Sequence, residues 1–67
     1  MEYTIFDTLA DGLILAVETS PSAAQARAFR LARGLRRPTI IDGFGLHVVV
    51  APDGSEKPIP PDWRPPS

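Results

Sequence analysis

Residues 20–34 read SPSAAQARAFRLARG, and this stretch predicts the helix on which the fold depends. Ser20 is a suitable N-cap, because Pro21 would then occupy the first helical position, where proline loses no hydrogen bond. Alternatively, Ser22 caps the helix and Gln25, three residues later, completes a capping box. The sequence therefore predicts a helix that begins at one of these two serines.

The predicted helix is amphipathic and spans about residues 21–33. We expect Gly34 to end it, because glycine readily adopts the left-handed conformation that terminates helices, and Leu35 to fold back onto Phe29. At ~100° per residue, small apolar side chains gather on one face and arginines on the other, so that the helix can lie close to a sheet. The apolar face consists of Ala24, Ala28, Leu31 and Ala32, and the basic face of Arg27, Arg30 and Arg33.

Two short strands are predicted before the helix. Residues 2–8 (EYTIFDT) are rich in β-branched and aromatic side chains, and residues 13–18 (LILAVE) form a second apolar run. Asp11 and Gly12 lie between them and are typical of a hairpin turn, because glycine tolerates the positive φ that such turns require. A β-hairpin is therefore expected ahead of the helix.

Further strands are predicted after the helix. Residues 39–42 (TIID) and 46–51 (LHVVVA) are apolar and β-branched, and the intervening 43–45 (GFG) indicates a turn. This glycine-containing segment is too short for a phosphate-binding loop and is not followed by a helix. Residues 55–59 can add a short edge strand, weakened by Pro58.

These elements predict an α+β domain over residues 1–57, with the order ββαββ and a further optional strand. We expect an antiparallel or mixed sheet in the spatial order 2-1-3-4, with one helix packed on one face. Five of the last ten residues are proline. Residues 58–67 are therefore predicted to form an extended proline-rich tail.

The predicted sheet carries more apolar side chains than one helix can cover. On the second strand, simple alternation places Leu13, Leu15 and Val17 on one face and Ile14 and Ala16 on the other. On the fourth strand it places Leu46, Val48 and Val50 on one face and Val49 and Ala51 on the other. We expect the second face to be covered by the tail, through Ile59 and Trp63, or by a second copy of the chain in a homodimer. The homodimer is favoured, because a proline-rich tail has few backbone donors with which to anchor itself.

The residue types present give little support for catalysis or cofactor binding. The chain has no cysteine, which excludes disulfides and thiolate zinc sites. Its one histidine, His47, lies on the predicted fourth strand, where we expect an exposed or hydrogen-bonded side chain instead of a catalytic base paired with Asp42 or Ser55. We therefore expect no catalytic, cofactor-binding or metal-binding residues and no enzymatic activity.

Location and source can be judged only from composition. No apolar run approaches the roughly 20 residues of a membrane-spanning helix, and the acidic Glu2 is unlike the basic start of a secretory signal. We expect no membrane association and a cytoplasmic location. The preference for arginine, alanine and proline is typical of GC-rich bacterial and phage genomes.

Charge is distributed unevenly along a chain whose net charge is −1. The candidate partner-binding residues are the clustered arginines Arg27, Arg30, Arg33, Arg36 and Arg37; every acidic residue lies outside this segment. We expect a non-enzymatic module that binds a protein partner, such as a phage or bacterial inhibitor or regulator. The alternative is a nucleic-acid-binding accessory protein, which the low net charge and the scarcity of nearby aromatic residues disfavour.

Overall fold

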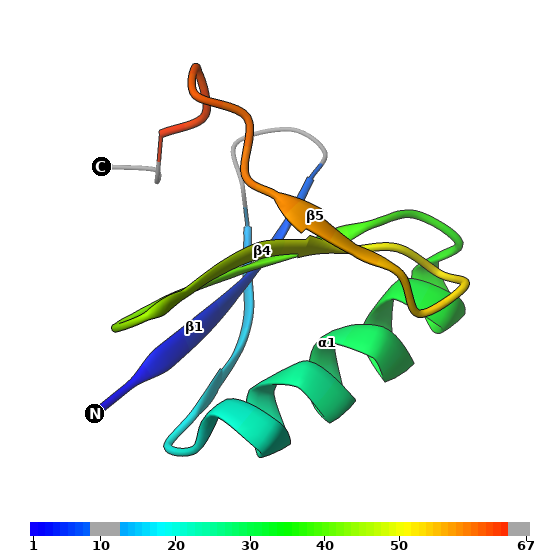
Figure 1. The fold of residues 1–67 in the computed structure, drawn as a ribbon. Coiled ribbons are helices and arrows are strands. Elements are labelled where there is room, and N and C mark those ends of the chain that lie inside the picture. The colour runs from blue at the N-terminus through cyan, green and yellow to red at the C-terminus, as the bar shows by residue number, and fades with distance from the viewer. Residues whose placement is uncertain (9–12, 65–67) are drawn as a thin grey trace.

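The computed structural model describes residues 1–8 and 13–64. Within these residues, one helix packs against one face of a five-stranded antiparallel sheet, which confirms the predicted α+β class (Figure 1). The elements are β1 (Tyr3–Asp7), β2 (Ile14–Glu18), α1 (Pro21–Leu35), β3 (Thr39–Gly43), β4 (Leu46–Val50) and β5 (Glu56–Pro58). No helix in this described part is both long and apolar enough to cross a bilayer.

The first strand lies inside the sheet, between β2 and β3, and the strand order is β2-β1-β3-β4-β5. The predicted order 2-1-3-4 is confirmed, with β5 added beside β4. Because β2 and β3 each pair antiparallel with β1, they run parallel to each other, and α1 connects them across β1. The predicted turn between β3 and β4 consists of Phe44 and Gly45, and Gly45 has a φ of 73°. The turn predicted at Asp11 and Gly12 lies outside the described residues.

The helix begins as the first alternative predicts. Ser20 has extended backbone angles, and its Oγ accepts a hydrogen bond from the Ala23 amide at 3.2 Å. Pro21 is the first helical residue, where its missing N–H is not needed. Ser22 lies inside the helix, so the capping box that it would form with Gln25 is not the N-terminal cap.

The end of the helix differs from the prediction. Gly34 and Leu35 are both helical, and the left-handed residue is Arg36, with φ 59° and ψ 34°. The Arg37 side chain, immediately afterwards, is hydrogen-bonded to Asp7 of β1. We attribute the later end of the helix to this tertiary contact, which fixes the chain where it leaves the helix and makes the local preference of Gly34 unimportant.

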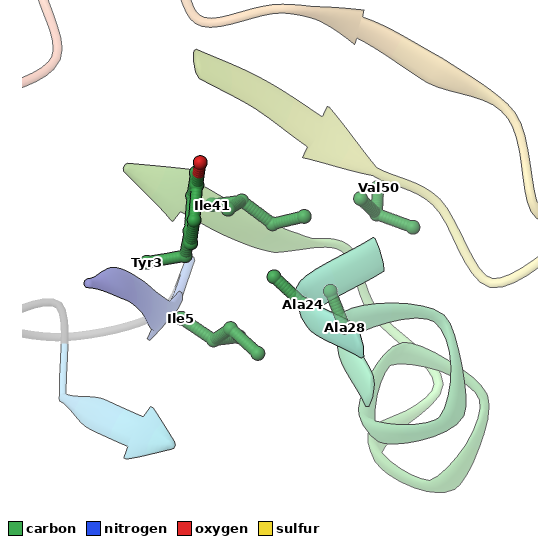
Figure 2. Close-up of a cluster of buried hydrophobic side chains, with 6 residues drawn as sticks. All are labelled: Tyr3, Ile5, Ala24, Ala28, Ile41 and Val50. Atoms are coloured by element: carbon green, nitrogen blue, oxygen red, sulfur yellow. The ribbon is translucent and has the colours of Figure 1, made fainter. Parts of the chain in front are cut away.

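The core lies between α1 and the sheet. Ala24, Ala28 and Ala32 are fully buried, as predicted, whereas Leu31 is only partly buried at the margin. Figure 2 shows Ala24 and Ala28 directed toward a cluster of Tyr3, Ile5, Ile41 and Val50. Because alanine is small, the helix backbone approaches the sheet closely, and the buried Thr39 hydroxyl donates to the Ala28 carbonyl at 2.9 Å.

A β-bulge at Leu15 changes how β2 distributes its apolar side chains. The register with β1 shifts there, and both Leu15 and Ala16 pack against the core on the helix side. Ile14 and Val17 lie on the other face and are 55% and 48% exposed. The prediction that Ile14 and Ala16 share a face is therefore wrong, because an extra residue in one strand interrupts the alternation.

The tail covers part of the second sheet face. The Trp63 ring lies 5.5 Å from the Phe6 ring, centroid to centroid, in an edge-on arrangement at 62°. Phe6 and its neighbour Ile40 are 5% and 2% exposed. In Figure 1 the chain after β5 runs on the side of the sheet opposite α1. The expected cover by the tail is thus observed at Trp63, while Ile59 is only partly buried; the homodimer remains a prediction.

Candidate partner-binding surface

The five candidate arginines do not form one surface. Arg37 donates from Nε and from one terminal nitrogen to the two carboxylate oxygens of Asp7, at 2.8 and 2.6 Å. The Asp7 side chain is only 8% exposed. Hydrogen bonding to this carboxylate raises the pKa of the Arg37 guanidinium above its ordinary value, so Arg37 stays charged. Arg37 therefore holds the end of α1 to β1 through a two-point contact between its planar group and the carboxylate.

Arg27 is also paired within the molecule. Its guanidinium lies 2.8 Å from Glu18 at the end of β2, and its side chain is half exposed. Exposed pairs of this kind contribute about 0–1 kcal/mol to stability. The contact nevertheless offsets the charge of Arg27, which leaves Arg30, Arg33 and Arg36 as the candidates without a carboxylate partner in the described part of the chain.

Two of these three arginines border a hollow on the solvent side of α1. The hollow has a volume of about 450 Å³, and it is lined by Ala26, Phe29, Arg30 and Arg33. The Arg33 guanidinium carbon lies 5.5 Å from the centroid of the Phe29 ring, a cation–π arrangement. We call these four residues the arginine surface. Arg36 is exposed at the end of the helix, outside the lining.

Phe29 is held in place from its other side. The turn after β4 brings Gly54 against the ring, close enough that a Cβ on Gly54 would lie 3.4 Å from it. Gly54 has a φ of 91°, a left-handed conformation that favours glycine. An apolar ring fixed between a turn and a guanidinium gives the hollow a stable aromatic wall.

The chemistry of the arginine surface suits an acidic ligand with an apolar part. Guanidinium groups bind carboxylates and phosphates with paired hydrogen bonds, and the Phe29 ring offers apolar area beside them. Arg33 also lies in the last turn of α1, where a cation is stabilised by the helix dipole. This stabilising role needs no ligand, but it does not account for the aromatic wall or for Arg30.

The sequence identifies the candidate arginines but does not show which of them are paired with acidic residues. The contacts Arg27–Glu18 and Arg37–Asp7 join different elements, so no local sequence pattern predicts them. For Phe29 the sequence predicts only a contact with Leu35. The place of Phe29 three residues after Ala26 and four residues before Arg33 was the available signal, because such spacings bring side chains together on a helix.

His47 is placed on the other face of the sheet. Its Nδ1 lies 2.8 Å from the Asp42 carboxylate, its cross-strand neighbour, and both side chains are partly exposed. Ser55 instead donates its amide and hydroxyl to Asp53, at 2.9 and 2.7 Å. His47 is thus an exposed strand histidine that lies beside Asp42, whereas Ser55 is hydrogen-bonded to Asp53.

Comparisons of the chain with protein-family models, with curated proteins and with solved structures found no match. The case for a function therefore depends on the geometry and chemistry of these residues.

Proposed function

We propose that this chain is a non-enzymatic binding module whose arginine surface receives an acidic segment of a partner protein. The observation that carries the proposal is the hollow in which Arg30 and Arg33 border the fixed ring of Phe29. A carboxylate of the partner would be held by the guanidinium groups. An adjacent apolar side chain would cover the ring.

Preorganisation makes this surface better suited to binding than a row of mobile arginines. Binding costs free energy for every long side chain that it immobilises, about 0.5–1.5 kcal/mol each. Stacking on Phe29 already restricts Arg33, so part of that cost is met before the partner arrives. Arg30 has no carboxylate partner within the described residues, so its charge is available to the ligand.

A small regulator or inhibitor, of bacterial or phage origin, is the class of protein that fits this site. Such a protein acts by occupying a surface of its partner, which requires one rigid helix face and no catalytic group. The 67-residue chain offers one helix with its outer side free, held on a sheet by the alanine face.

Nucleic-acid binding is the second candidate, because Arg30, Arg33 and Arg36 are all exposed near the end of α1. Two observations place it second. Arg27 and Arg37 are paired with acids, which reduces the charge available for phosphates, and the net charge is −1. Only Phe29 offers an aromatic ring beside these arginines, and that ring already carries Arg33.

A labelled acidic peptide tests the proposal directly. Fluorescence anisotropy would compare a peptide of aspartate, glutamate and leucine with the same peptide carrying amides in place of carboxylates. We expect only the acidic peptide to bind, and Arg30→Gln with Arg33→Gln to weaken it at least about tenfold, or about 1.4 kcal/mol. Arg27→Gln is the control for each single substitution, Arg30→Gln or Arg33→Gln, because it removes one positive charge from the same helix outside the arginine surface.

Phe29→Ala and an oligonucleotide separate the two candidates. Phe29→Ala should weaken peptide binding while the far-ultraviolet circular dichroism of the helix is kept. Equal binding of the acidic and amidated peptides would overturn the proposal. Tight, strongly salt-dependent binding of single-stranded DNA or RNA, without binding of the peptide, would replace it with the nucleic-acid alternative.

A further inference from the structure

The two edges of the sheet are protected very differently. The outer strand on one side, β5, has three residues and ends in Pro58, and Lys57 lies beside Val49 of β4. Short length, proline and lysine are the features that prevent an edge strand from pairing with another chain. The outer strand on the other side, β2, has five residues, and none of them is proline or lysine. Among the residues that the structure describes, only the β2 edge lacks these protecting features.

The open edge is also apolar. Ile14 and Val17 are 55% and 48% exposed, and Leu13, immediately before the strand, is 65% exposed. Within the described residues, β2 pairs only with β1, so its outer side has backbone donors and acceptors that no other strand uses. Exposed apolar side chains next to such an edge indicate a protein–protein contact.

We propose that β2 pairs antiparallel with β2 of a second copy, so that two sheets join into one ten-stranded sheet. A two-fold axis perpendicular to the sheet relates strands paired in this way, and each presents the same surface to the other. Near the axis, the apolar residues of one copy then lie beside apolar residues of the other copy. The one charged residue of β2, Glu18, lies at the end of the strand, so antiparallel pairing keeps the two copies of Glu18 apart.

This arrangement locates the homodimer at the sheet edge and leaves the tail in place. The Trp63–Phe6 contact covers part of the second face within each chain, so no partner is needed at Phe6. The two-fold axis also puts both α1 helices on the same face of the joined sheet. The inference does not depend on the proposed function, although two arginine surfaces on one face would make the dimer bivalent toward acidic partners.

Association measured against concentration tests the inference. Sedimentation equilibrium from about 1 µM to about 1 mM should show a reversible monomer–dimer equilibrium. Val17→Lys, which adds the edge-protecting residue that β5 already has, should raise the dissociation constant at least about tenfold. Phe44→Lys is the matched control, since Phe44 is 75% exposed at the turn between β3 and β4, and it should leave the constant unchanged.

Hydrogen exchange of the unaltered protein tests the inference without any substitution that could unfold the chain. Amides of β2 that exchange quickly in dilute solution should become protected as the concentration rises, whereas those of β5 should not change. A chain that stays monomeric over the whole range would overturn the inference. So would a dimer in which Val17→Lys and Phe44→Lys behave alike, or in which the newly protected amides lie outside β2.

Discussion

Replacing Trp63 by alanine should remove the cover from Phe6 and destabilise the fold. Phe6 is 5% exposed although it lies on the face opposite the helix, and the Trp63 ring is packed edge-on against it. The substitution exposes most of one ring and deletes the other. Its cost therefore measures how much the tail contributes to a sheet that one helix covers on one side only.

The expected cost can be estimated from the contacts. Burial of a large apolar side chain contributes about 1.5–3 kcal/mol, and an edge-on aromatic pair adds about 0.5–1.5 kcal/mol. Because Trp63 is itself only partly buried, we expect a loss near the lower end of the sum, about 2–3 kcal/mol. A domain of 67 residues has about 3–10 kcal/mol of stability in total. The melting temperature should therefore fall by on the order of 10 °C.

Urea unfolding followed by circular dichroism would measure this loss without using tryptophan emission. In the unaltered protein, Trp63 emission should be blue-shifted relative to the unfolded chain, since the ring is packed against Phe6. Phe44→Ala is the matched control, because it removes an aromatic ring that is 75% exposed and should cost less than about 0.5 kcal/mol. Equal midpoints for the two variants, or Trp63 emission typical of water, would refute the reasoning.

Substitutions at three further positions test local features. Ser20→Ala removes the N-cap of α1 and should cost about 0.5–2 kcal/mol in urea unfolding, whereas Ser20→Asp should restore most of it. Gly43→Ala places a methyl group against the buried Tyr3 ring and should cost about 1–3 kcal/mol. Hydrogen bonds from the Ser55 amide and hydroxyl lower the pKa of Asp53, so the stabilisation is present above the ordinary aspartate range and is lost as the pH falls through the lowered pKa. An NMR titration should show this lowered pKa, and Ser55→Ala should raise it toward the ordinary value.

Most of the fold could be predicted because its signals are local. The serine–proline start of α1, the alanine face and the apolar runs each specify an element within a few residues, and short connections then restrict the strand order. The β-bulge at Leu15 could not be predicted. Residues 13–17 are apolar at five successive positions, so no alternation of apolar and polar side chains indicates which of them face the helix. The end of α1 was missed for a different reason: its position depends on Arg37 meeting Asp7, 30 residues earlier.

The candidate site was predicted in outline only. The order of residues along the chain places the arginines in one segment, and helical periodicity correctly predicts that Arg27, Arg30 and Arg33 are exposed. Which of them retain a free charge depends on acids contributed by β1 and β2, and that depends on how the strands assemble. The Phe29 ring, which lines the hollow, likewise lies against Gly54, which comes from a distant part of the chain.

The position of β1 between β2 and β3 affects the order in which the fold can assemble. Tyr3 pairs with Glu18 on one side and with Gly43 on the other, the latter a contact between residues 40 positions apart (43 − 3). Closing so long a loop costs more entropy than forming the hairpin of β3 and β4, which a two-residue turn connects. The β1–β2 hairpin is also local, since Phe6 pairs with Ile14. We expect the two hairpins and α1 to form early and the pairing of β1 with β3 to form late. Until β1 and β3 pair, each presents an open apolar edge, so the folding chain, more than the folded one, is vulnerable to aggregation.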